Sequence, residues 1–571
     1  MKRKRPTIVE LDKRKLEELL QRIEAVLDTE DYQTIKTLIE SCLCLAELLG
    51  EKSVTINRLR QWLFGAKTEK TAAVTANGPQ AENPPPGVNA STDAIPEANV
   101  ESSTAADTAL AAANDSLAPR KGHGRNGADA YHGAEKIRVS HESLKPGDPC
   151  PECQKGTVYS TTPGVLVRIT GQAPLQAKVY EIEKLRCGLC GKIFTAQAPD
   201  GVKEAEKHDA TVPSVIALLK YGSGMPFNRL EGLQGLLGIP LPASTQWDLV
   251  FEFYRQPVES VYAELIRQAA QGDLFHNDDT TARILEFMGK RAKAQAFAGD
   301  ALPGSAQKQR RGLFTTGIIS ISEGRRIALF FTGRKYAGEN LEDVLRQRAA
   351  ELATPLQMCD ALSRNRPGDF KTFLGNCLTH GRRKFVELVE FFPTACRYVL
   401  EALRVIYRND AIARERNLSP QARLEFHQAE SGPTMESLHA WLTRQFDERL
   451  VEPNSAVGKA MRYMLKHWQK LALFLREPGA PLDNNICERA LKKAILHRKN
   501  SLFYKTCRGA RVGDALMSLI YTSELCGANP LDYLTTLKRH AGEASANPQN
   551  WMPWNYQAAL SAATAPADAA L

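Results

Sequence analysis

The sequence lacks any apolar run of about 18 residues or more, so it offers no candidate for a transmembrane helix. Its start, Met1 to Pro6, is basic but is not followed by the apolar stretch of a signal peptide. Lys and Arg are missing between Thr71 and Pro119, where six acidic residues occur. These absences predict a soluble, cytoplasmic protein without membrane contacts, whose positive charge lies outside that segment.

The chain has 571 residues, too many for a single hydrophobic core, and this length predicts three or four domains. Its formal net charge is +9, and the excess is larger still when the acidic segment is set aside. Such an excess favours a polyanionic partner, although many basic proteins gain only solubility from it.

Apolar residues between Ile35 and Leu63 recur at steps of three and four. This spacing indicates a short coiled coil that dimerises the chain, or an amphipathic helix that packs on its own chain, and both interpretations stay open. Residues 67–120 are rich in Ala, Thr, Asn, Pro and Ser. Such a composition buries too little apolar surface to offset the entropy of ordering, so we predict a flexible linker.

Two Cys-x-x-Cys pairs follow, Cys150 with Cys153 and Cys187 with Cys190. Four thiolates can bind one zinc ion tetrahedrally, which leaves no open position for catalysis. Because disulfides are rare in the cytoplasm, the spacing predicts a structural zinc site. A redox dithiol is the weaker alternative, since no thioredoxin-like pattern surrounds the pairs.

Residues 211–254 show the pattern of two helices, a turn and a further helix. This is the layout of a DNA-binding helix-turn-helix, in which the last helix enters the major groove. An ordinary helical hairpin has the same pattern, and only the neighbouring segments favour DNA binding.

From Gly272 the pattern changes to strands. Three strand-like segments are followed by a helix and by a short apolar strand that ends on Asp360. This is the opening order of a ribonuclease-H-like domain, in which the first and fourth strands are neighbours. Acids on those strands, Asp278 or Asp279 on the first and Asp360 after the fourth, would then share one site.

A third acid is expected from the helix that follows Asp483-Asn484-Asn485, with Glu488 in its first turn or just beyond. Three carboxylates suit hard cations such as Mg²⁺. Two such ions about 4 Å apart activate a water or a 3′-hydroxyl for in-line phosphoryl displacement. Spacing alone does not select these three acids among the 65 acidic residues of the chain.

Over nearly its whole length the chain resembles the insertion-sequence-66 family of DDE transposases. The similarity rests on Asp483-Asn484-Asn485 with Glu488-Arg489, on Arg498-Lys499-Asn500 with Phe503, and on the block from Cys377 to Phe385. It extends to Asn529–Leu534, to Trp551–Asn555, to the N-terminal helix and to the paired cysteines.

This resemblance implies a catalytic triad of Asp278, Asp360 and Glu488 that binds two Mg²⁺ ions, for which Mn²⁺ can substitute. The family's Asp-Glu-Thr and Asp-Gly-Tyr blocks are Asp278-Asp279-Thr280 and Asp360-Ala361-Leu362 here. Basic residues flank these acids and are expected to bind DNA phosphates. They are His380, Arg382, Arg383, Arg489, Lys492, Arg498 and Lys499.

The predicted fold class is multidomain α/β, a ribonuclease-H-like core with a large all-helical insertion. Between Asp360 and Glu488 the pattern is densely helical. This insertion serves either to hold DNA or only as a structural spacer that returns Glu488 to the core. The predicted segments are a coiled-coil region (1–66), a linker (67–120), a zinc-binding domain (121–205), a helix-turn-helix region (206–268), the first part of the core (269–384), the helical insertion (385–480), the final helical part of the core (481–541) and a tail (542–571).

The leading hypothesis is a transposase that cuts transposon ends in double-stranded DNA and joins them to target DNA. It would act on the nucleoid in the bacterial cytoplasm as a homodimer or higher oligomer, with accessory proteins of the same element as further partners. A non-catalytic DNA-binding regulator, or an inactive transposase remnant, is the alternative of another class. A related nuclease without strand transfer is a third.

Overall fold

A computed structural model describes residues 207–288 and 312–564 continuously, with short segments between residues 22 and 37 and between 145 and 199. Most of the predicted coiled coil, the whole linker 67–120 and all four zinc-site cysteines lie outside the described residues. Two three-residue strands, β1 (Lys184–Arg186) and β2 (Ile193–Thr195), pair in antiparallel fashion within the predicted zinc-binding segment.

A five-stranded mixed sheet forms the centre of the described chain, with the strand order β5-β4-β3-β6-β7. Strand β3 pairs antiparallel with β4, which pairs antiparallel with β5, while β6 runs parallel to β3 and β7 runs parallel to β6. The first and fourth strands of this sheet are therefore adjacent, as expected. The strands are β3 (Leu274–Thr281), β4 (Phe314–Ser322), β5 (Arg325–Gly333), β6 (Leu356–Cys359) and β7 (Phe373–Asn376).

The strands occur where the sequence pattern predicts them, apart from β7. Glu323 and Gly324 form the turn between β4 and β5, and both have positive φ, 47° and 78°. A two-residue hairpin turn of this kind needs positive φ at both positions. Strand β7 was not anticipated, because two of its four residues are Gly375 and Asn376, types that are uncommon in strands.

Helices cover both faces of the sheet. Helix α9 (Ala337–Leu345) packs on β3 and β4 from one face, and α16 (Asn485–Ser501) packs on the same two strands from the other. Helix α7 (Glu259–Ala269) contacts both α9 and β5. This layering matters for function because it brings the start of α16 beside the end of β3.

Helix α17 (Cys507–Leu525) protects the outer edge of β5. Three side chains at successive turns accept hydrogen bonds from β5: Asp514 Oδ2 from the Thr332 amide (2.7 Å), Ser518 Oγ from the Phe330 amide (2.9 Å) and Thr522 Oγ1 from the Ala328 amide (3.0 Å). An unpaired strand edge would otherwise offer these amides to another chain.

Asp514 gives the fold a predictable dependence on pH. Burial raises the pKa of its carboxyl to about 8, although two hydrogen bonds from Thr332 oppose that rise. The folded chain then holds this proton more tightly than the unfolded chain does. Its contribution to stability is full below the unfolded pKa, near 4, and is lost as pH rises towards 8.

We expect Asp514→Asn to remove this loss of stability at rising pH, because the Asn side chain does not ionise. Between pH 5 and 8 the unfolding free energy of the variant should rise relative to wild type by up to about 1.4 kcal/mol per pH unit. Ser518→Ala is the matched control, because it removes a neutral hydrogen bond between α17 and β5. Its unfolding free energy should fall by the same amount at every pH. Denaturant titrations between pH 5 and 8 measure the unfolding free energies. The same pH dependence of unfolding free energy in wild type and Asp514→Asn would refute the prediction.

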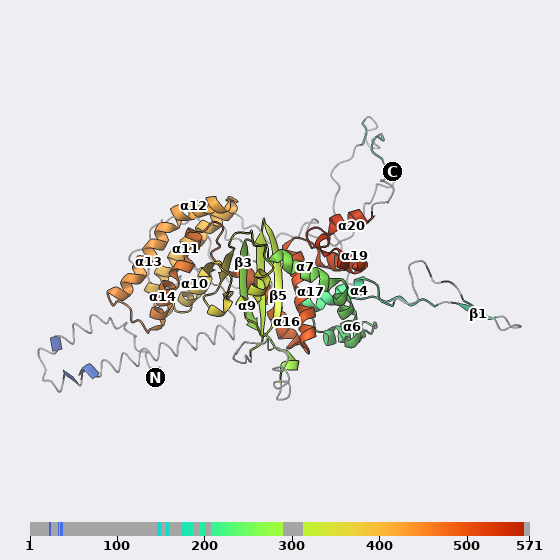
Figure 1. Ribbon diagram of the computed structural model, residues 1–571, viewed down its shortest axis with the longest axis horizontal. Coiled ribbons are helices and arrows are strands. Elements are labelled where there is room, and N and C mark those ends of the chain that lie inside the picture. The colour runs from blue at the N-terminus through green and yellow to red at the C-terminus, as the bar shows by residue number, and fades with distance from the viewer. Residues whose placement is uncertain are drawn as a thin grey trace. The chain divides into compact units, whose positions relative to one another are not determined.

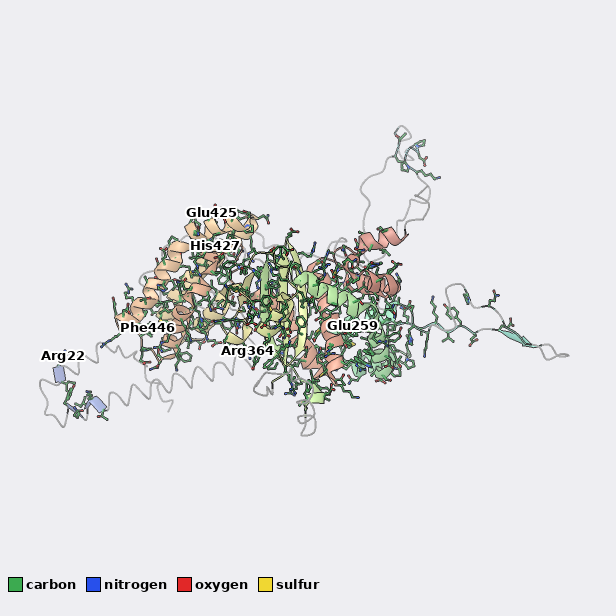
Figure 2. All side chains as sticks on the ribbon, in the orientation of Figure 1. Arg22, Glu259, Arg364, Glu425, His427 and Phe446 are labelled. Atoms are coloured by element: carbon green, nitrogen blue, oxygen red, sulfur yellow. The ribbon has the colours of Figure 1, made fainter. Side chains whose placement is uncertain are left out.

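Between β7 and α16 the described chain is helical, as predicted (Figure 1). The helices of this segment share one apolar core, which includes Leu403, Leu438 and Met461. His427 and Phe446, labelled in Figure 2, belong to the same segment. The helices are α10 (Leu378–Val386), α11 (Pro393–Glu415), α12 (Pro420–Glu430), α13 (Gly432–Asp447), α14 (Ala456–Lys466) and α15 (Trp468–Leu471).

Helices also occur where the helix-turn-helix was predicted. They are α4 (Thr211–Ala217), α5 (Phe227–Leu236) and α6 (Ala243–Phe253). Helix α4 contacts α18 (Pro530–Arg539), one of the C-terminal helices with α19 (Ala541–Ala546) and α20 (Tyr556–Thr564). Within the described residues, no helix combines the length and apolarity that crossing a membrane requires.

Candidate active site

Asp278 lies near the end of β3, on the face of the sheet that α16 covers. Side chains alternate along a strand, so Asp278 shares its face with His276, whose Nδ1 lies 3.0 Å from Asn484 Oδ1 at the start of α16. Asp279 points to the opposite face, where its Oδ1 forms an ion pair with Arg364 Nη2 at 2.9 Å. The alternation thus separates the two acids, and Asp278 is the one on the side of Glu488.

Asp360 directly follows β6, the parallel neighbour of β3. Asn365, which is fully buried, joins it to Asp278: its Nδ2 donates to Asp360 Oδ1 and lies 3.4 Å from Asp278 Oδ1. The Asn365 carbonyl in turn accepts hydrogen bonds of 2.8 Å from Asn277 Nδ2 and Gln357 Nε2. The first and second acids are therefore connected through one amide that the sheet itself holds.

The Asp483-Asn484-Asn485 motif fixes the start of the helix that carries Glu488. Asp483 Oδ1 accepts a 3.1 Å hydrogen bond from the Asn485 amide. Asn484 is at the N-cap position but does not cap with its side chain, because its Oδ1 lies 3.0 Å from His276 Nδ1 while its Nδ2 donates to the Asn277 carbonyl (3.2 Å). Glu488 then lies in the first turn, as predicted.

Close approach of α16 to the sheet completes this placement. Gly317 is the register partner of Asp278 on β4, and a Cβ at Gly317 would lie 3.1 Å from the Leu491 side chain. The Gly317 carbonyl also accepts a hydrogen bond from Cys487 Sγ at 3.3 Å. A larger residue at 317 would push α16, and with it Glu488, away from Asp278.

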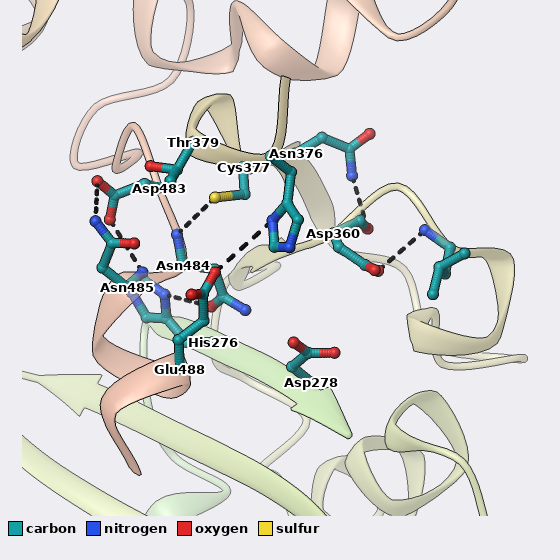
Figure 3. A network of polar contacts seen from close by, with 12 residues as sticks. His276, Asp278, Asp360, Asn376, Cys377, Thr379, Asp483, Asn484, Asn485 and Glu488 are labelled. Atoms are coloured by element: carbon teal, nitrogen blue, oxygen red, sulfur yellow. Dashed lines mark hydrogen bonds and ion pairs between the residues drawn. The ribbon is translucent and has the colours of Figure 1, made fainter. Parts of the chain in front are cut away.

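The carboxylates of Asp278, Asp360 and Glu488 lie around one space at the end of β3 (Figure 3). Burial raises the pKa of Asp278 to about 7, with the negative charges of Asp360, Asp279 and Glu488 adding to the rise. The pKa of Asp279 is also raised by burial, but Arg364 opposes that rise. Arg364 thus offsets the charge of Asp279 on one face of the sheet, whereas the effects on Asp278 from its neighbouring acids on the other face all raise its pKa.

Glu488 has a second set of neighbours on α10. His380 Nδ1 lies 3.8 Å from Glu488 Oε1, and both atoms are buried without a hydrogen-bond partner. The Cys377 sulfur, one ring nitrogen of His380 and one carboxylate oxygen of Glu488 all lie within 4.8 Å of one another. Cys377 is fully buried and its Sγ accepts a 3.3 Å hydrogen bond from the Asn484 amide. Burial raises the pKa of this thiol to about 11.

The predicted DNA-binding residues are divided between two helices. His380, Arg382 and Arg383 lie on α10, and the other four lie on α16. Arg489, Lys492 and Lys499 are exposed. Arg498 instead ties α16 to the end of β3, because its Nη1 donates to Thr280 Oγ1 (3.1 Å) and Thr281 Oγ1 (2.6 Å).

Sequence reasoning missed Asn365, the second role of Asn484 and the ion pair of Arg364 with Asp279. An Asn a few residues after an acid is common in loops, so nothing local marks Asn365 as a bridge. Asn484 belongs to a motif that was recognised, but its contact with β3 spans 207 positions of the chain. Only the fold brings these partners together.

Comparison with known proteins relates this chain to a family of transposases. Residues 208–512 match the model of the family described as Transposase IS66 family. An uncharacterized protein of Sinorhizobium fredii, y4jD, is 27% identical over 385 residues, which cover 65% of this chain and 71% of that protein. A second one, y4hP of the same organism, is 27% identical over 422 residues, covering 68% and 70% of the two chains.

The matched region runs from just before α4 into α17 and so contains the whole sheet, the helical segment and all three acids. It makes up more than half of the 571 residues. The chain therefore belongs to the IS66 family of transposases.

Proposed function

We propose that this protein cleaves DNA at the ends of its mobile element and joins the freed 3′-hydroxyl to target DNA, with Asp278, Asp360 and Glu488 as the catalytic carboxylates. The observation that carries the proposal is the meeting of these three side chains, which come from β3, the end of β6 and the start of α16. A DNA-binding regulator would have no need of such a cluster.

The sheet supports a ribonuclease-H-like core. Three antiparallel strands followed by two parallel ones, in the order β5-β4-β3-β6-β7, place the first strand at the centre. That order is what the predicted core requires for two acids on neighbouring strands. The helical segment between β7 and α16 then acts as an insertion that returns the chain to the sheet at Glu488.

The three carboxylates fit a hard divalent cation such as Mg²⁺, which prefers oxygen ligands. Burial raises the pKa of Asp278, and the negative charges of Asp360 and Glu488 add to that rise, so a bound cation would offset both effects. When bound, Mg²⁺ would supply activation of the attacking hydroxyl and stabilisation of the leaving oxygen; Mn²⁺ has the same preference for oxygen ligands.

The remaining residues would orient the acids and the DNA. Asn365 would hold Asp360 and Asp278 in place, and Asn484 would hold the helix of Glu488 against β3. The basic residues of α10 and α16 would bind phosphates beside the acids. Arg498 could take part through Nη2, since its bonds to β3 use Nη1.

The segments before the sheet would contribute to binding rather than to chemistry. We propose that Cys150, Cys153, Cys187 and Cys190 hold a structural zinc ion and that α5 and α6 form a helix-turn-helix. We also propose that the heptad from Ile35 to Leu63 joins two chains, so that two element ends are held together. Accessory proteins of the same element would complete the assembly.

Strand cleavage and joining on labelled element-end DNA tests this function. The purified protein should cut at the element end and join it to a second DNA with Mg²⁺ or Mn²⁺, and should do neither with EDTA. Specific binding of element ends without any cleavage, under all metal conditions, would favour the regulator instead.

A further inference from the structure

Cys377, His380 and Glu488 differ in chemistry from the three catalytic acids. They offer one sulfur, one nitrogen and one oxygen, whereas Asp278, Asp360 and Glu488 offer oxygen alone. Mixed sulfur and nitrogen donors favour borderline-soft cations such as Zn²⁺ over Mg²⁺. Glu488 belongs to both sets.

The spacing of the three atoms suits one small cation. The 3.8 Å between His380 Nδ1 and Glu488 Oε1 is too long for a hydrogen bond. Ligand atoms on one tetrahedral Zn²⁺ lie roughly 3.3–3.6 Å apart, given metal–ligand distances of about 2.0–2.3 Å. One donor atom of each of the three residues lies within 4.8 Å of the other two, so a closure of about an ångström would complete the site.

Two further observations point to a ligand at this place. Both His380 Nδ1 and Glu488 Oε1 are buried polar atoms without a hydrogen-bond partner, an arrangement that is costly unless something fills the gap. The sulfur of Cys377 is held from behind by the Asn484 amide, and such support orients a metal ligand. The side chains of His380 and Glu488 are 29% and 27% exposed, so they have room to close.

We propose that Cys377, His380 and Glu488 form a binding site for Zn²⁺, and that a zinc ion bound there inhibits the Mg²⁺-dependent reaction by holding Glu488. On binding, the Cys377 thiol releases its proton to solvent and a zinc–sulfur bond forms. The claim that zinc inhibits the reaction rests on the function proposed above, but the claim that zinc binds at this site does not.

Zinc content after equilibrium dialysis of the full chain tests the binding half. Wild type should hold one more Zn²⁺ per chain than Cys377→Ser or His380→Gln. Zinc bound elsewhere in the chain is common to all variants and cancels in the comparison. Cys396→Ser is the matched control, since it removes a buried thiol of the helical segment away from the cluster and should keep the wild-type content.

His380→Gln keeps the test decisive if Cys377→Ser does not fold, because residue 380 is only partly buried. Asp278→Asn should also retain the extra zinc, because Asp278 is not a ligand of this site. Equal zinc content in wild type, Cys377→Ser and His380→Gln would overturn the proposal. So would loss of the zinc in Asp278→Asn, which would assign the ion to the three acids.

Inhibition of Mg²⁺-dependent cleavage tests the second half. The Zn²⁺ concentration that halves the cleavage rate should be at least about tenfold higher for Cys377→Ser than for Cys396→Ser. Equal inhibition of these two variants, despite unequal zinc content, would refute the regulatory role. If wild type cleaves no DNA at all, the function proposed above fails, while the zinc counts still decide the binding site.

Discussion

Asp278→Asn should reduce strand cleavage by at least about a hundredfold to a thousandfold, the scale on which loss of one charge-stabilising group acts in a preorganised site. Asn keeps the size of Asp but removes the charge that a divalent cation needs. Binding of element-end DNA should stay close to wild type, because Asp278 donates nothing to a phosphate. Cleavage rates under single-turnover conditions and gel-shift affinities measure the two quantities separately.

Asp279→Asn is the control that the chain itself offers. It removes a carboxylate from the next residue, but on the opposite face of the sheet, where Arg364 is its partner. We expect this variant to cleave DNA at a rate much nearer to wild type. If Asp279→Asn abolished cleavage and Asp278→Asn did not, the assignment of the first acid would be reversed.

Asn484→Ala should lower both stability and activity. The substitution leaves His276 Nδ1 and the Asn277 carbonyl buried without their partner, at a cost of about 1–3 kcal/mol in unfolding free energy. Burial lowers the pKa of His276 to about 4, so its ring is neutral at pH 7 and its Nδ1–H can donate to Asn484 Oδ1. Loss of this anchor frees the first turn of α16.

Because Glu488 lies in that turn, the Mg²⁺ concentration needed for half-maximal cleavage should rise by about tenfold to a hundredfold. Asn485→Ala is the matched control, since among the described residues the hydrogen bond of its side chain goes to Asp483 and not to β3. Thermal unfolding and Mg²⁺ titrations of cleavage give the two readouts. A variant with lowered stability but an unchanged Mg²⁺ requirement would show that Asn484 has no part in positioning Glu488.

The sequence predicted β3, β4, β5 and β6 because their signals are local, whereas the three acids were proposed from the family motifs. The run from Phe314 to Ser322 is apolar and rich in β-branched residues, and Asp360 ends a short apolar segment. Periodicity therefore placed the elements, and the family motifs selected the acids. The alternation of side chains along β3 places Asp278, and not Asp279, on the face that α16 covers, a choice that the sequence pattern left open.

Other features depend on partners that are distant in sequence. Asp514, Ser518 and Thr522 form a polar stripe at helical spacing, which normally indicates a solvent-exposed face. Here the stripe is buried against the edge of β5, about 190 positions earlier in the chain. Arg498 is a comparable case, since a basic residue on the helix of a proposed catalytic acid suggests phosphate binding, yet its Nη1 is bonded to β3.

Asp278, Asp360 and Glu488 are proposed to bind the catalytic cations together. Anomalous X-ray scattering from crystals of the protein with element-end DNA and Mn²⁺ tests this proposal most directly. We expect two manganese peaks about 3.5–4 Å apart, with oxygen atoms of all three carboxylates among their ligands. Manganese that is not coordinated by Glu488, or the absence of manganese between Asp278 and Asp360, would contradict this proposal.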